Sequence, residues 1–106
     1  MVAGDPLGAL RRLLLGGALA LLAGGCGPIH YTSNIIAAET ALEEARDGNA
    51  RRQAAYEFYS AEVYLEKARE EAAEGQYEDA IRFADAATSY AQQALQVAMR
   101  KDGDDG

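Results

Sequence analysis

The stretch that decides the fold runs from Gln53 to Ala98 and reads QAAYEFYSAEVYLEKAREEAAEGQYEDAIRFADAATSYAQQALQVA. Apolar residues recur along it at alternating steps of four and three, which places them on one face of a helix. In the first half these residues are Ala54, Phe58, Ala61, Leu65, Ala68 and Ala72, and in the second half they are Ala80, Ala84, Ala87, Ala91, Ala94 and Ala98. The residues between the halves, Glu74 to Tyr77, are typical of a turn, so the stretch predicts two antiparallel helices.

The second stripe consists of alanine alone, and this predicts how closely the two helices pack. A helix that offers only methyl groups allows its neighbour's backbone to approach closely. We therefore expect Ala87 and Ala91 to be buried in a tight seam. We also expect Gly75 to end the first helix at a positive φ, where only glycine avoids a steric cost.

A near-repeat upstream indicates a third helix. Residues 38–46 and 61–69 share the pattern AExxLExAR at an offset of 23 residues. In one unbroken helix, at about 100° per residue, the two stripes would point about 140° apart and could not share a core. A bend at Gly48-Asn49 removes this conflict. We therefore predict an all-α fold, a small three-helix antiparallel bundle with an alanine-rich seam, with helices near residues 34–47, 51–74 and 77–101.

Apolar residues outside these stripes predict how the helices are placed. The first helix, capped by Ser33 or Asn34, would bury one stripe. Its members are Ile35, Ala38, Leu42 and Ala45. The third helix has apolar residues on both sides of its alanines, so it should pack between the other two. They are Tyr77, Ile81, Leu95 and Met99 on one side, and Phe83, Tyr90 and Val97 on the other.

Composition excludes several classes of function. The chain has 106 residues and a net charge of −7, which disfavours nucleic acid as a partner. Its single cysteine cannot form an intramolecular disulfide, and no Cys/His cluster is present to bind a metal. The lone His30 has no partners for catalysis, so we interpret it as an exposed residue. We predict no enzymatic activity, no metal and no cofactor.

The first 25 residues have the order of a secretory signal. Arg11 and Arg12 precede the apolar run Leu13 to Leu22, and small residues follow. This run is about half of the roughly 20 residues that a membrane-spanning helix needs, so we expect the segment 1–25 to be cleaved.

The sequence Leu22-Ala23-Gly24-Gly25-Cys26 resembles the lipobox of bacterial lipoproteins. The resemblance implies cleavage before Cys26 and attachment of lipid to its thiol. In that family an Asp after the cysteine often retains the protein in the inner membrane, and Gly27 here implies the periplasmic face of the outer membrane instead. We expect a lipidated tether over residues 26–33, in which Pro28 disfavours helix. The bundle domain would then span residues 34–101, followed by a disordered acidic tail over 102–106.

Two helical families resemble the region beyond the tether. Gly75 to Ile81, together with Tyr64, is similar to the turn of a tetratricopeptide repeat, but no second copy follows. Nearly all of residues 35–98 resembles bacterial lipoproteins that carry the domain of unknown function 4398. The residues that carry this resemblance are Ala41 to Arg46, Ser60 to Glu62, Leu65 to Arg69 and Gly75 to Ala80. The family implies an envelope protein as partner, such as an OmpA-like module.

These features predict a non-enzymatic structural or adaptor module in a cell-envelope assembly. A small core with an alanine seam has little stability to spare, which favours a bound partner. Tyr56, Tyr59 and Val63 lie opposite the seam of their helix and form a candidate contact patch, unless the first helix or the tether covers them. The alternative function is a peptide-binding or secretion-chaperone lipoprotein, pilotin-like, that uses a tetratricopeptide-like groove.

Overall fold

The fold is all-α, as predicted. The structure, a computed structural model, describes residues 6–105 and the side chains of residues 27–104. It contains α1 (Pro6–Asp47), α2 (Ala50–Gln53), α3 (Ala55–Ala73) and α4 (Tyr77–Asp105), with no strand among the described residues. Within the same part of the chain, none of these helices combines the length and apolar character needed to cross a membrane.

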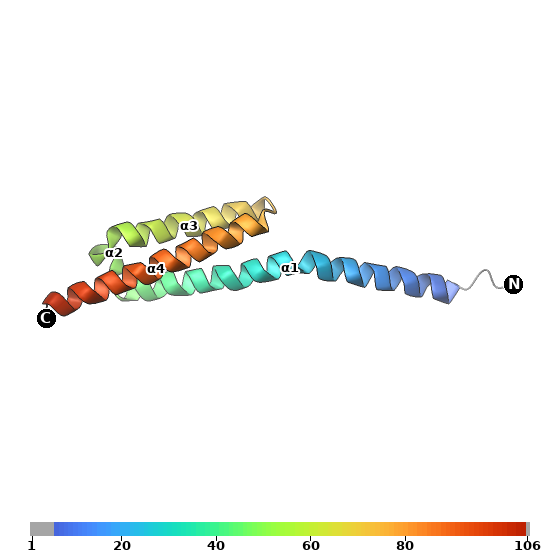
Figure 1. The fold of residues 1–106 in the computed structure, drawn as a ribbon, viewed down its shortest axis with the longest axis horizontal. Helices are drawn as coiled ribbons and strands as arrows, with labels where there is room; N and C mark the ends of the chain where they lie inside the picture. The colour runs from blue at the N-terminus through green and yellow to red at the C-terminus, as the bar shows by residue number, and fades with distance from the viewer. Residues whose placement is uncertain (1–5, 106) are drawn as a thin grey trace.

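The three long helices pack side by side, with α4 between α1 and α3 (Figure 1). Helix α3 runs antiparallel to both neighbours. Helix α1 runs parallel to α4, because Gly27 lies beside Tyr77 at one end and Gly48 lies beside Leu95 near the other. The N-terminal part of α1 extends beyond the bundle, which gives a molecule with extents of 87 × 23 × 14 Å.

The core is built from the predicted stripes. All six alanines of the α4 stripe are at most 2% exposed, and Ala87 and Ala91 are buried as expected. Phe58 of α3 is the largest fully buried side chain. The stripe of α1, from Ile35 to Ala45, is buried in the same cluster. Ala72 is the exception, since it lies near the end of α3 and is only partly buried.

The turn after α3 has the expected geometry. Gly75 has a φ of +78°, as predicted. The N–H of Gln76 donates to the carbonyl of Glu71 at 2.8 Å, and the N–H of Gly75 donates to that of Ala72 at 3.0 Å. This pair of bonds is the Schellman motif, which satisfies carbonyls left free at a helix end. The bend after α1 is also present where expected, with Asn49 in the left-handed region at φ 64°.

The helix predicted over residues 51–74 is divided in two. Ala54 leaves helical geometry, with φ −139° and ψ 57°, and separates the single turn α2 from α3. The break brings Ala50 and Ala54 into the core, where they are 0% and 3% exposed. Burial of these two methyl groups determines the path of the connection between α1 and α3. The helical period of the sequence did not indicate the break at Ala54.

The predicted start of the first helix was wrong. We expected residues 26–33 to be a non-helical tether with a cap at Ser33 or Asn34, but they are helical within α1. Pro28 removes one helical hydrogen bond there. Packing compensates, because Gly27 and Tyr31 both contact Tyr77 of α4.

The acidic segment after residue 101 also differs from the prediction. Helix α4 continues to Asp105, although residues 102–104 are exposed. Extending an existing helix gains one hydrogen bond for each residue added, without a new nucleation cost. The prediction of a disordered tail was therefore wrong for residues 102–105, and residue 106 lies outside the described part.

Candidate interaction surface

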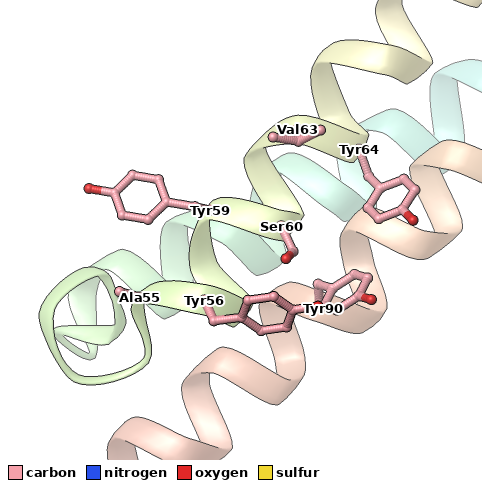
Figure 2. A pocket seen from close by; sticks show the side chains of 7 residues that line it. All are labelled: Ala55, Tyr56, Tyr59, Ser60, Val63, Tyr64 and Tyr90. Atoms are coloured by element: carbon pink, nitrogen blue, oxygen red, sulfur yellow. The ribbon is translucent and has the colours of Figure 1, made fainter.

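A groove of about 510 Å³ lies between α3 and α4 on the surface of the bundle (Figure 2). We call it the tyrosine groove. It is lined by Ala55, Tyr56, Tyr59, Ser60, Val63, Tyr64 and Tyr90. Six of these residues come from the first half of α3, and only Tyr90 comes from α4. The groove is thus located toward the end of the bundle where α2 lies, away from the turn at Gly75.

Aromatic rings from α3 and α4 meet along the side of the groove that faces α4. The rings of Tyr64 and Tyr90 stack at 5.4 Å between centroids with an interplanar angle of 9°. Tyr56 meets Tyr90 edge-on at 6.4 Å, and Phe83 stacks on Tyr64 at 6.0 Å. Aromatic pairs of this kind contribute beyond the area they bury. The row therefore joins α3 to α4 and holds this wall of the groove in shape.

The three residues of the predicted contact patch all line the tyrosine groove. Tyr56 is 72% exposed, Tyr59 is 46% exposed and Val63 is 66% exposed. Neither α1 nor the residues of the expected tether cover them. An exposed apolar cluster on a small protein is a feature of interaction sites.

Sequence reasoning missed four of the seven lining residues, of which Tyr64 and Tyr90 are the aromatic ones and Ala55 and Ser60 the small ones. Tyr64 was noted only for its likeness to a repeat motif, and Tyr90 only as an apolar flank of its helix. The signal was present in the spacing, because Tyr56, Ser60 and Tyr64 follow one another at steps of four on one helix face. The spacing did not predict how α4 is rotated about its axis, and this rotation places Tyr90 against Tyr64.

One edge of the groove carries a positive charge. The Nε–H of Arg51 donates to the hydroxyl of Tyr59 at 3.3 Å. This hydrogen bond raises the pKa of Arg51 above its ordinary value. Tyr56, followed by Tyr64, raises the pKa of Tyr90 above its ordinary value. At neutral pH Tyr90 is therefore neutral, and Arg51 carries a positive charge at the Tyr59 edge of the groove.

A second, charged cleft of about 380 Å³ lies between α1 and α3. Its eight lining residues form four pairs at the 23-residue offset of the near-repeat: Glu39 with Glu62, Leu42 with Leu65, Glu43 with Glu66, and Arg46 with Arg69. The two copies of the motif thus face each other.

In this cleft, Arg46 also forms an ion pair with Glu43 at 2.5 Å, and its guanidinium carbon lies 5.7 Å from the ring centre of Phe58.

The other predicted features are distributed as follows. The backbone of Cys26 is helical within α1, but its side chain lies outside the described part, so lipid attachment there stays a prediction. His30 is exposed, as its interpretation required. Among the described residues, no group of three or more His, Cys, Asp or Glu side chains is placed to bind a metal ion.

These observations define a small helical bundle with an alanine seam and an exposed tyrosine groove. Residues 33–105 match the family described as Domain of unknown function (DUF4398). Since the match covers more than half of the chain, the protein belongs to this family. No curated protein and no solved structure matches the chain.

Proposed function

We propose that this protein is an outer-membrane lipoprotein whose periplasmic bundle acts as a non-enzymatic adaptor in a cell-envelope assembly. Residues 1–25 are the signal peptide, and Cys26 carries the lipid. The tyrosine groove is the surface that binds an envelope protein, for which an OmpA-like module is the expected candidate. The observation that carries the proposal is the exposure of Tyr56, Tyr59 and Val63 together on one groove.

The position of Pro28 supports cleavage before Cys26. In the precursor, Pro28 lies inside α1, where a proline costs about 3 kcal/mol because it removes a hydrogen bond and crowds the preceding turn. In the cleaved protein, Cys26-Gly27-Pro28 forms the first turn, where the missing N–H has no helical partner in any case. Cleavage thus converts a costly proline into one that the first turn of a helix tolerates.

The thinness of the core supports the need for a partner. Thirteen of the seventeen buried hydrophobic residues are alanines, and each buries little area. At about 25 cal/mol per Å² of apolar area, such a seam stabilises the bundle less than one of leucines would. Covering the exposed tyrosines with a partner removes more apolar surface from water and stabilises the folded state by mass action.

Two experiments test the proposal. Cys26→Ser offers no thiol for lipid attachment, and we expect the protein to leave the outer-membrane fraction or to accumulate as precursor. Mature-sized Cys26→Ser protein that still fractionates wholly with the outer membrane would show that lipid does not hold it there. For the groove, a photo-crosslinking amino acid is placed at Tyr59 in intact cells, and the same amino acid at exposed Glu44 of α1 is the control. We expect a discrete adduct with an envelope protein from position 59 alone.

The second candidate is a peptide-binding or secretion-chaperone lipoprotein, pilotin-like. The aromatic lining and the volume of the tyrosine groove favour it, since such a groove can hold a short apolar peptide. The crosslinking experiment separates the two functions. A stable envelope component as the adduct supports the adaptor, whereas an exported protein captured only during its secretion supports the chaperone.

A further inference from the structure

We infer that the lipid-anchored bundle stands upright on the membrane, with the turn between α3 and α4 facing the bilayer and the tyrosine groove directed away from it. This inference rests on the proposed lipid attachment at Cys26 and adds an orientation to it. The partner of the membrane-facing end is a lipid bilayer surface.

The first step is the contact that ties the anchor to the bundle. Gly27, the residue directly after Cys26, packs against α4, and a Cβ built on it would lie in van der Waals contact with Tyr77, 3.4 Å from its Cβ and its Cδ2. Tyr31, one helical turn later, meets the ring of Tyr77 at 6.1 Å. We call Gly27, Tyr31 and Tyr77 the collar. Because the collar begins one residue after the cysteine, no flexible segment separates the lipid from the folded bundle.

The second step concerns the side chains at the end of the bundle where the collar lies. Tyr77 opens α4, so the turn at Gly75 and Gln76 lies beside the collar. Ile29 is 65% exposed within one turn of Cys26, and the two half-buried collar tyrosines lie at the same end. Apolar side chains and tyrosines are typical of segments that lie at the boundary between lipid and water.

The third step is the direction in which the bundle extends. Helix α1 continues from Gly27 to Asp47, about 30 Å at 1.5 Å per residue, along α4 and parallel to it. Asn34, about two turns after Gly27, donates to Asp85 of α4 at 2.8 Å, which keeps the two helices in register. The start of α3, where Tyr56 and Tyr59 lie, is therefore at the end opposite the collar (Figure 1).

Charge does not account for this orientation. The collar end carries exposed Glu74 and Glu78, which an anionic lipid surface would repel. The covalent lipid and the rigid collar set the orientation instead. The consequence for function is that the tyrosine groove meets partners at a fixed height of tens of ångströms above the bilayer.

Fluorescence quenching in vesicles tests the orientation. Cys26 is the only cysteine, and lipid occupies its sulfur, so one introduced cysteine is the only thiol that a fluorophore can label. Gln76→Cys and Gln96→Cys are matched, because both glutamines are exposed and they lie about 30 Å apart along α4. The full lipidated protein is reconstituted in phosphatidylcholine vesicles that carry a nitroxide on the headgroup. We expect strong quenching of the label at position 76 and none at position 96.

A variant of the collar completes the test. Tyr77→Ala should reduce the quenching at position 76, whereas Tyr77→Phe, which keeps the ring, should preserve it. Equal quenching at positions 76 and 96 in protein that mass spectrometry shows to be lipidated would overturn the orientation alone. Lack of lipid on Cys26 would overturn the proposed anchor and the orientation together. Quenching unchanged by Tyr77→Ala would overturn the role of the collar.

Discussion

The guanidinium of Arg69 in α3 donates to the carboxylate of Glu39 in α1 at 2.7 Å. Its counterpart under the 23-residue offset is the pair of Arg46 with Glu62, at 3.8 Å. Each copy of the near-repeat thus supplies a carboxylate to the arginine of the other. The two helices are therefore related by a local twofold axis, and Leu42 and Leu65 occupy equivalent positions in the cleft between them.

Reversing the charges of the first pair tests this relation. Glu39→Arg places two cations together and should lower the free energy of unfolding by up to about 1 kcal/mol, the range of exposed ion pairs. The double variant with Arg69→Glu should recover most of the loss. Glu44→Arg, at an exposed position of the same helix, is the control. If the two single effects simply add in urea unfolding of the anchor-free domain, the pair contributes no coupling.

Enlarging the alanine seam should destabilise the bundle. Ala87 and Ala91 are 2% and 0% exposed, so Ala87→Leu and Ala91→Leu force extra carbons between close backbones. Such overpacking typically costs about 1 to 3 kcal/mol. Gln93→Leu on the exposed face of α4 should be nearly neutral, since the two residues have similar helix propensities. Urea midpoints of the alanine variants that match Gln93→Leu would show that the seam is not tight.

The effect of substituting Gly75 on stability should come from its backbone conformation and not from a steric clash of the new side chain. A Cβ at Gly75 would meet nothing within 4 Å, yet its φ is +78°. Gly75→Val should therefore lower stability by roughly 1 to 2 kcal/mol through the left-handed geometry alone. Gly103 also has free space but no positive φ, so Gly103→Val is the matched control and should cause no loss. Equal thermal midpoints for the two variants would refute the conformational explanation.

Tyr31 in the collar should make the bundle sensitive to alkaline pH. Desolvation by burial raises the pKa of Tyr31, and Glu39 and Tyr77 raise it further against the opposing effect of Arg69. The fold therefore favours the neutral phenol. The contribution of the neutral Tyr31 to the free energy of unfolding is complete below the ordinary pKa of about 10. It is lost as the pH rises through the higher pKa of the folded state. Tyr31→Phe should show a smaller fall in thermal midpoint between about pH 9 and about pH 11 than the unmodified protein. Equal falls in the two proteins would contradict this.

The sequence by itself determined the helical class, the seam of α4, the turn at Gly75 and the bend at Asn49. Each of these depends on local chemistry: the period of the apolar residues, the small size of alanine, and the few residues that tolerate a positive φ. The tyrosine groove could also be predicted in part, because Tyr56, Tyr59 and Val63 lie opposite a clear apolar stripe on their own helix.

Only the tertiary structure decided that residues 27–33 are helical, where α3 begins and which residues complete the groove. Pro28 argues locally against helix, but contacts of Gly27 and Tyr31 with Tyr77, about fifty residues away in the chain, outweigh it. Tyr90 joins Tyr64 because of the rotation of α4 against α3. Such contacts depend on the packing of whole helices against one another, and the free energy of that packing does not appear in the periodicity of any single segment.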